Sequence, residues 1–375
     1  MVDERIYWLV WSQIAGVGPV LLQRLQAEFG SLAAAWAEAD LSGVNGIGGQ
    51  TQASILRQRS QLHPEQLYTH HLRQNPHFWT PADPDYPRLL LEIADPPPVL
   101  YYRGQVRPEE NQGSIPTVAM VGTRDPTDYG KRWTRRLAKT LTQKGFVVVS
   151  GMAEGIDTQA HQSCLEAGGR TIAVLGTGVD QIYPPRNQGL YQRIVETGLV
   201  LSEYPAGTQP NRAHFPRRNR IIAGLSRATL VLEAPKQSGA LITAYLANDY
   251  SRDVYVLPGS LDNPKAMGCL GLVSRGAQLI LGEGHLLELL GALPPLAPIS
   301  GASSQADPTA GLSAELAEVY RLLRDLCQSM GQPAVPYDLL AAQTQQAPGT
   351  LSGALLQLEL LGLVVQQPGM RYGLT

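Results

Sequence analysis

The chain contains few cysteines and no long apolar segment. Its 375 residues include three cysteines, Cys164, Cys269 and Cys327, which are far apart and form no Cys-x-x-Cys pair. This spacing argues against a disulfide framework and against a structural zinc site. The apolar run near the N-terminus, residues 6–11, is too short for the core of a signal peptide or for a membrane span. We therefore expect a cytoplasmic protein that does not associate with membranes.

Charge is also scarce, and neither sign dominates. Charged residues make up 17% of the chain, and the formal net charge at pH 7 is −2. The molecule as a whole is therefore not a basic nucleic-acid-binding protein, and any site for a polyanion must be a local patch. The hydrophobic content of 43% is typical of a globular protein. The length allows two or three domains.

Residues 1–80 have the pattern of a small helical domain of the helix-hairpin-helix or SAM-like kind. Two segments, 14–25 and 44–56, each combine a Gly-x-Gly turn with a helical pattern that follows it. Backbone amides at such a helix start can hold a phosphate, or the turns can simply pack short helices together. Few Lys or Arg residues lie near either turn, which favours the packing role.

Residues 81–290 predict a Rossmann-like α/β domain with a doubly wound, mostly parallel sheet. Prolines in the connector 80–104 exclude a long helix there. Apolar runs that are rich in Val, Ile and Leu then recur at 117–122, 146–151, 171–176, 198–203, 228–234, 253–259 and 277–282. Helical patterns such as 131–145 and 243–250 separate them. This alternation is typical of a parallel sheet that is buried on both faces.

The C-terminal part predicts a linker and a third domain. Residues 291–311 are rich in Pro, Ser, Gly and Ala, as in an interdomain linker. Residues 312–375 contain three helical patterns followed by a strand, a turn and a strand, which together indicate a winged helix. Between Gly349 and Val364, where a recognition helix is expected, there is no Lys or Arg. We therefore expect this domain to contact protein rather than to read DNA.

The ends of the predicted strands share a glycine-rich composition. They are VGTR (121–124), SGMAEG (150–155), LGTGVD (175–180), LSEYP (201–205), EAPKQSG (233–239) and LPGS (257–260). In an open parallel sheet, ligands bind at the carboxyl ends of the strands. Glycines allow backbone amides to approach an anion there, and the hydroxyls of Ser150 and Ser238 could add donors. This composition predicts a phosphate-bearing ligand.

Motifs for the common nucleotide-dependent enzymes are absent. The sequence has no G-x-x-x-x-G-K-[ST], and LGTGVD places Gln181 where the third glycine of a dinucleotide fingerprint belongs. Asp157 and His161 could form an acid/base pair, but this spacing is more typical of a helix-capping Asp and a His that packs on the sheet. Glu154 is a candidate acid with no nucleophile nearby in the sequence. We expect no catalytic residue, no cofactor and no metal.

The segment 204–232 combines five arginines with no acidic residue. The arginines are Arg212, Arg217, Arg218, Arg220 and Arg227. Guanidinium groups are rarely buried without a partner, so we expect a bound anion to supply the partner that the protein lacks. Phe215 offers a stacking surface and Asn219 an amide, while Ile221, Ile222 and Leu225 should pack beneath. Arginine beside an aromatic ring is typical of sites for single-stranded nucleic acid.

The ordered motifs VGTR, SGMAEGIDTQAH, LGTGVDQIYP, FPRRNRIIAGLS, SGALITA and LPGS resemble those of the DprA (Smf) family of DNA-processing proteins. The resemblance covers about residues 117–282. It implies a non-enzymatic protein that binds and protects incoming single-stranded DNA during natural transformation and loads the RecA recombinase onto it. It also implies a homodimer formed through the Rossmann-like domain. One departure is Leu270, where the family commonly has Asn.

The strand-end argument and the resemblance select the same region for DNA binding. The residues expected to bind DNA are Gly122, Thr123, Arg124, Ser150, Gly151, Gly155, Phe215, Arg217, Arg218, Asn219, Arg220, Ser238 and Gly239. The alternative is a Rossmann-like nucleotide phosphoribohydrolase in which Glu154 or Glu233 acts on an N-glycosidic bond. The PGGxGT motif expected of such enzymes does not occur, which disfavours this alternative.

Overall fold

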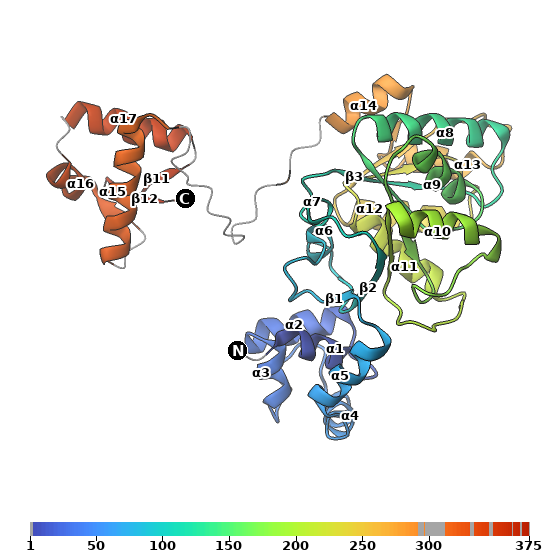
Figure 1. Cartoon of the computed structure of the whole chain (residues 1–375), viewed down its shortest axis with the longest axis horizontal. Coiled ribbons are helices and arrows are strands. Elements are labelled where there is room, and N and C mark those ends of the chain that lie inside the picture. The colour runs from blue at the N-terminus through green and yellow to red at the C-terminus, as the bar shows by residue number, and fades with distance from the viewer. Residues whose placement is uncertain are drawn as a thin grey trace. The chain divides into compact units, whose positions relative to one another are not determined.

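The computed structural model describes residues 3–291, 296, 312–330, 334–344, 348–361, 363–367 and 370–374. The chain divides into two compact units, Met1–Ala297 and Pro298–Thr375 (Figure 1). Apart from Gly291 and Leu296, the expected linker 291–311 lies outside the described residues. No helix in the described part of the chain is both long enough and apolar enough to cross a membrane.

The first unit begins with the expected group of short helices. They are α1 (Glu4–Ser12), α2 (Pro19–Phe29), α3 (Leu32–Ala37), α4 (Gly49–Arg59) and α5 (Pro64–Gln74). Gly16 and Gly46 have φ values of +89° and +97°, a region that favours glycine, and each makes the turn before a helix. The helices pack around buried Trp11, whose indole Nε1 donates to Leu32 O at 3.0 Å. The two Gly-x-Gly turns therefore hold short helices together.

A nine-stranded sheet forms the centre of this unit. Its parallel strands, in the spatial order β6-β5-β4-β3-β7-β8-β9, confirm the seven predicted runs. They are β3 (Thr117–Val121), β4 (Val147–Ser150), β5 (Thr171–Leu175), β6 (Leu199–Ser202), β7 (Ala228–Val231), β8 (Asp253–Val256) and β9 (Gln278–Leu279). Two strands that the sequence did not predict, β1 (Phe78–Trp79) and β2 (Leu100–Gly104), add an antiparallel edge, in which Tyr101 pairs with Ser202 of β6.

Helices cover both faces of the sheet. The remaining helices of the unit are α6 (Arg88–Leu91), α7 (Pro108–Asn111), α8 (Asp128–Gln143), α9 (Ile156–Glu166), α10 (Gln188–Thr197), α11 (His214–Gly224), α12 (Gly239–Asp249), α13 (Met267–Val273) and α14 (Glu283–Gly291). On one face α8 and α9 contribute Leu137 and Ala160 to the core. On the other face α11 and α12 contribute Ile222 and Leu241. Because β3, β4, β5, β6 and β7 are buried along their whole length, their sequences are dominated by apolar residues.

The strand order places a ligand crevice between β3 and β7. From β3 the chain winds outward through β4, β5 and β6, and it then returns through α11 to β7, on the other side of β3. The carboxyl ends of β3 and β7 are therefore neighbours from which the connections diverge, and this is where open α/β sheets bind ligands.

The second unit is a winged helix. It contains α15 (Ala314–Met330), β10 (Ala334–Pro336), α16 (Tyr337–Gln343), α17 (Pro348–Leu360), β11 (Val364–Gln367) and β12 (Arg371–Leu374). The expected terminal hairpin is the antiparallel pair β11–β12, and β10, which the sequence did not predict, completes the sheet in the order β10-β12-β11. Leu323, Leu351 and Leu355 are fully buried between the helices and the sheet.

Candidate nucleic-acid site

A cavity of about 660 Å³ opens at the carboxyl ends of β3 and β7. Its walls come from the loop after β3, from the first turns of α11, and from the loop that leads into α12. Eight of the expected residues line it: Gly122, Thr123, Arg124, Phe215, Arg218, Asn219, Ser238 and Gly239. Segments more than 100 residues apart in the sequence thus meet at the predicted edge of the sheet.

Aromatic rings and exposed arginines form one side of the cavity. The half-buried ring of Phe215 lies 5.4 Å from the ring of Tyr183, centroid to centroid, at an angle of 35°. The guanidinium carbon of Arg124 lies 5.8 Å from the Phe215 ring centre. Arg212, which is exposed, also lines the cavity. Tyr183, in the motif LGTGVDQIYP, is not among the residues expected from the sequence, although an aromatic residue after a glycine-rich strand end is a usable signal.

Arg218 forms the floor of the site. The residue is 4% exposed. Nη1 donates to Gly151 O at 2.6 Å and to Val174 O, and Nε donates to Asn219 Oδ1 at 3.3 Å. Burial lowers the pKa of Arg218 to about 10, so the group is still charged at neutral pH. The floor of the cavity therefore carries a positive charge that backbone carbonyls solvate.

Asp157 is the acidic group among the residues that line this cavity. It is buried in the first turn of α9, and its Oδ2 accepts from Gly151 N at 3.1 Å and from Ala153 N at 3.4 Å. Burial raises the pKa of Asp157 to about 6, although nearby Arg218 opposes this shift. Its partner in the sequence pattern, His161, is fully buried with Nδ1 2.7 Å from Thr171 Oγ1. The expectation of a His packed on the sheet is confirmed, but that of a helix-capping Asp is wrong, because Asp157 lies inside the first turn and accepts from amides that precede the helix.

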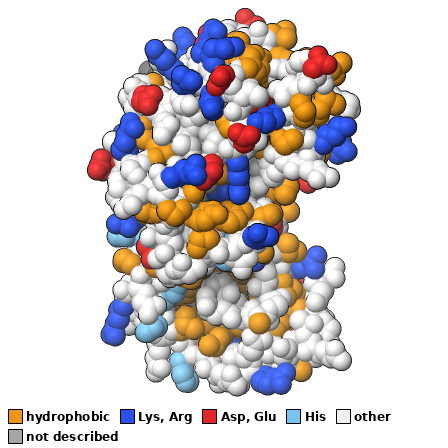
Figure 2. All heavy atoms as spheres, turned by 90° about the vertical axis from the view of Figure 1, so that its right-hand side faces the viewer, with side chains coloured by type: hydrophobic (Ala, Val, Ile, Leu, Met, Phe, Trp, Pro, Cys, Tyr) orange, Lys and Arg blue, Asp and Glu red, His pale blue; other side chains and the backbone are white. Residues whose placement is uncertain are grey.

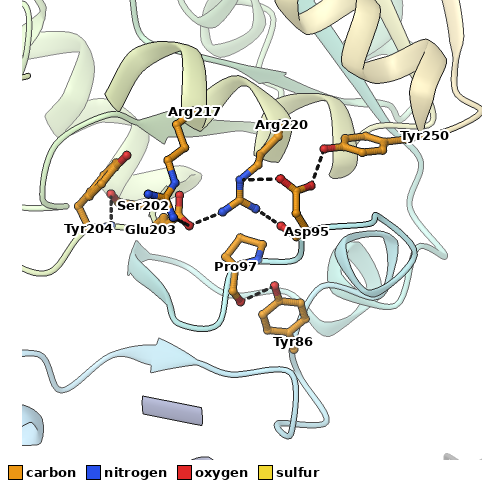
Figure 3. A network of polar contacts seen from close by, with 9 residues as sticks. All are labelled: Tyr86, Asp95, Pro97, Ser202, Glu203, Tyr204, Arg217, Arg220 and Tyr250. Atoms are coloured by element: carbon orange, nitrogen blue, oxygen red, sulfur yellow. Dashed lines mark hydrogen bonds and ion pairs between the residues drawn. The ribbon is translucent and has the colours of Figure 1, made fainter. Parts of the chain in front are cut away.

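Arg220 and Arg217 have partners within the protein, so the expectation that these arginines depend on a bound anion is wrong (Figure 3). Arg220 is 5% exposed in its side chain; it donates to Glu203 and to Asp95 O, and its Nε lies 3.4 Å from Asp95 Oδ2. Arg217 Nη2 lies 3.5 Å from the same Glu203 carboxylate. The reason is topological, because Glu203 directly follows β6, just before the acid-free segment, and Asp95 comes from the distant connector.

The network around Arg220 continues to Tyr250, whose hydroxyl donates to Asp95 Oδ1 at 2.7 Å. Close to this network, the hydroxyl of Tyr86 donates to Pro97 O at 2.9 Å. Neither Arg217 nor Arg220 lines the large cavity. Both lie on the other side of α11, beside a smaller cavity of about 290 Å³. The arginine segment therefore has two roles, with Arg212 and Arg218 at the cavity and Arg220 in a buried ion-pair network.

Three other expected residues lie around the cavity rather than on its wall. Ser150 is fully buried and its hydroxyl donates to Met120 O at 2.6 Å, so the expectation that it offers a donor to a ligand is wrong. The amide of Gly151 already donates to Asp157. Gly155, with φ +79°, lines a smaller cavity of about 260 Å³ that also contains Arg124. Gly151 lines another small cavity with Arg124, Phe215 and Arg218.

The two glutamates considered for catalysis do not line the large cavity. Glu233 is 2% exposed and accepts hydrogen bonds from Thr127 N at 2.8 Å, Thr127 Oγ1 at 2.7 Å and Asn263 Nδ2 at 3.2 Å. Glu154 forms an ion pair with Arg186 at 3.1 Å. Glu233 thus holds the start of α8, because Thr127 caps this helix through the amide of Gly130.

Comparison with known proteins gives matches over most of the chain. Residues 77–291 match the model of the DNA recombination-mediator protein A family, and residues 303–370 match the DprA winged helix domain. Protein Smf from Synechocystis sp. is 49% identical over 392 residues, covering 99% of this chain and 98% of that protein. DNA processing protein DprA from Bacillus subtilis is 42% identical over 205 residues, covering 55% of this chain and 68% of that protein.

Two solved structures have the same fold. DprA from Streptococcus pneumoniae superposes with a TM-score of 0.66 at 35% identity, over 76% of this chain and 98% of that one. DNA processing protein A from Helicobacter pylori, a protein with a single-stranded DNA binding mode, superposes with a TM-score of 0.51 at 33% identity, over 57% of this chain and 95% of that one. With its sheet, its winged helix and its strand-end motifs in the family's order, this chain belongs to the DNA recombination-mediator protein A (DprA/Smf) family.

Proposed function

We propose that this protein binds single-stranded DNA in the cavity between β3 and β7 and acts, without catalysis, as a recombination mediator. The observation that carries the proposal is the combination of Phe215 with Arg124, Arg212 and Arg218 around one cavity. Exposed guanidinium groups attract phosphates, and an accessible ring can stack on a base whatever its identity. A base is accessible for such stacking only when its strand is unpaired.

The salt dependence of binding tests this proposal. About four phosphate contacts in a single strand give a slope of about −3 for log K against log [salt], since each contributes about −0.7. We expect Arg124→Ala/Arg212→Ala to flatten the slope by about 1.4, because it removes two of these contacts. Fluorescence anisotropy with labelled oligothymidylate at several salt concentrations measures the slope for wild type and for the variant.

A matched control keeps this test specific. Arg73→Ala/Arg193→Ala removes the same charge from exposed positions on α5 and α10 and should leave the slope unchanged. Equal slopes for wild type and Arg124→Ala/Arg212→Ala would show that the cavity is not the binding site. Tighter binding to duplex than to single strands of equal length would argue against base stacking on Phe215.

We further propose that the bound strand is incoming DNA during natural transformation, that the protein protects it, and that it loads RecA onto it as a homodimer formed through the Rossmann-like domain. The family's description as a recombination mediator supports this step. The measurement is nucleation of RecA filaments on a strand that is already covered by single-strand-binding protein. Acceleration by wild type but not by Arg124→Ala/Arg212→Ala is the expected result, and sedimentation at the same concentrations gives the oligomeric state.

A further inference from the structure

One exposed face of α8 carries an excess of positive charge. Among the 16 residues of α8 there are five cations, Lys131, Arg132, Arg135, Arg136 and Lys139, and one acidic residue, Asp128. The opposite face of the helix packs on the sheet through Leu137, Ala138 and Leu141. Figure 2 shows Lys and Arg side chains gathered at the upper end of the first unit, where Figure 1 places α8.

This excess is unfavourable for the helix itself. Lys131, Arg135 and Lys139 follow one another at intervals of four residues, so they form a row along the helix in which each lies about 6 Å from the next. Like charges at this spacing destabilise a helix by about 0.2–0.5 kcal/mol for each pair. Cations in the first turns of a helix also oppose its dipole. An anionic ligand would offset both costs.

Neighbouring acids neutralise only part of the charge on α8. Arg136 is bound by Glu283 of α14, with Nε–Oε1 and Nη2–Oε2 distances of 3.0 and 3.1 Å. Lys131 lies 3.8 Å from Asp128, whose side chain is 98% exposed. Within residues 3–291, Arg135 and Lys139 are exposed and lie within ion-pair distance of no carboxylate.

The row is continuous with the proposed binding site. Arg124 lines the large cavity and also the adjacent cavity of about 260 Å³, which Lys131 and Arg186 line as well. The two acids of this adjacent cavity are already paired, Asp125 with Lys265 at 2.6 Å and Glu154 with Arg186 at 3.1 Å. Positive groups therefore lead from the cavity through Arg124 and Lys131 onto the exposed face of α8.

We infer that the exposed row Lys131–Arg135–Lys139 of α8 is a second contact surface for the phosphates of the same DNA strand, outside the cavity. This inference rests on the proposed function, because the cavity must hold one part of the strand before α8 can hold the next. A single row of cations that continues from a cavity with stacking rings matches the phosphates of an extended single strand. The cavity would then bind bases and phosphates, whereas α8 would bind phosphates alone.

Strand length separates the two surfaces experimentally. An oligothymidylate of about 5 nucleotides should fill only the cavity, whereas one of about 16 nucleotides should reach α8 as well. In the full-length protein we expect Arg135→Ala/Lys139→Ala to bind the short strand as wild type does. For the longer strand the salt slope should fall by about 1.4, and affinity at about 0.1 M salt should fall about tenfold. Arg73→Ala/Arg193→Ala is the control and should change neither.

Each other result has a definite meaning. Unchanged binding of the longer strand by Arg135→Ala/Lys139→Ala would overturn the role of α8, and so would an equal loss for both lengths. A loss confined to duplex DNA would overturn it too, since α8 would then be a duplex site. If wild-type protein binds neither length, the proposed function itself fails. Loss of both lengths in Arg124→Ala/Arg212→Ala, beside loss of only the longer in Arg135→Ala/Lys139→Ala, is the pattern expected for one strand on two surfaces.

Discussion

The guanidinium group of Arg218 lies directly against the α-carbon of Gly151. A methyl group added to Gly151 would lie 2.7 Å from Cζ, Nη1 and Nη2 of Arg218, which is closer than real contacts allow. The same guanidinium donates to the carbonyl oxygen of Gly151 at 2.6 Å. A residue without a side chain is therefore needed at position 151 to make room for the Arg218 guanidinium. The amide of Gly151 is not free for a ligand, because it already donates to Asp157.

Gly151→Ala should displace Arg218 from the cavity floor. We expect a loss of about 1–3 kcal/mol in the free energy of unfolding, which is typical of overpacking in a buried site. Affinity for oligothymidylate should fall as well. Urea denaturation and anisotropy measure the two effects. Gly189→Ala, at an exposed position of α10 with no atom within 4 Å of the new methyl group, should be neutral or slightly stabilising. Equal stability of the two variants would contradict the crowding seen at Gly151.

Arg220→Ala should unfold the protein more readily while leaving the large cavity intact. Glu203 is 8% exposed in its side chain and would lose its short-range partner, and leaving a buried charge unpaired costs about 3–5 kcal/mol. Arg217→Ala removes a pair whose arginine is 56% exposed, and should cost less than about 1 kcal/mol. Urea titrations of both variants give the comparison. A small loss of stability in Arg220→Ala together with a large loss in Arg217→Ala would mean that Arg217, and not Arg220, is the buried partner of Glu203.

Phe215→Leu should weaken binding of single-stranded DNA without a comparable loss of stability. Removing one stacked base contact costs about 1–3 kcal/mol, which corresponds to a loss of about 5- to 150-fold in affinity. Phe215→Tyr keeps the ring and should bind nearly as wild type does. Because neither change alters charge, the salt slope should be the same in all three proteins. A loss in Phe215→Leu that is accompanied by a flatter slope would mean that the ring acts through the placement of Arg124 instead of through stacking.

His161 should make the fold sensitive to acid. Burial lowers its pKa from 6.5 to about 3, so below pH 6.5 the unfolded chain binds a proton that the folded chain does not. Stability should therefore fall by about 1.4 kcal/mol for each pH unit between pH 6.5 and about 3. Thr171 Oγ1 donates to Val148 O, so it accepts from His161 Nδ1–H, and Nε2 remains without a partner among the described residues.

His161→Asn tests this dependence, because an amide does not titrate in this range. The difference in unfolding free energy between pH 7 and pH 5 should be about 2 kcal/mol smaller in the variant than in wild type. Asp157 acts in the opposite direction, since its pKa is raised from 3.8 to about 6 and its protonation favours the folded state as the pH falls. It is present in both proteins, so the comparison isolates His161. An identical pH dependence in the two proteins would contradict a neutral buried imidazole.

The parallel strands could be predicted from the sequence because their burial on both faces produces a local pattern. An apolar run such as TVAMV needs no knowledge of its neighbours to be recognised. Strand β1 has two residues and β2 runs LYYRG, in which only the first two residues are buried. These edge strands form because β6 offers free backbone groups to β2, and short strands with a solvated end carry no such pattern.

The position of the candidate site could be predicted from the sequence, but the ion-pair partners of its arginines could not. Strand-end glycines and the FPRRNR segment pointed to the region that the cavity occupies. The partners of Arg220 were missed, because Asp95 is 125 residues away in the sequence and reaches it only in the folded chain. The stretch 204–232 contains no acidic residue, but the residue that directly precedes it is Glu203. Charge balance along a segment thus says little about a buried arginine, whose counterion is set by tertiary contacts.

The hydrogen bonds of Glu233 bear on how fast a ligand could bind at the large cavity and the start of α8. Its carboxylate joins the end of β7 to Thr127 at the start of α8 and to Asn263 after β8, and it lies so close to Gly130 that a methyl group there would be 2.3 Å from Oε2. The cavity wall and the start of α8 are thereby clamped together before any ligand arrives. Capture would need no slow rearrangement of this corner and would lose little conformational entropy, so the frequency of productive collisions would govern its speed.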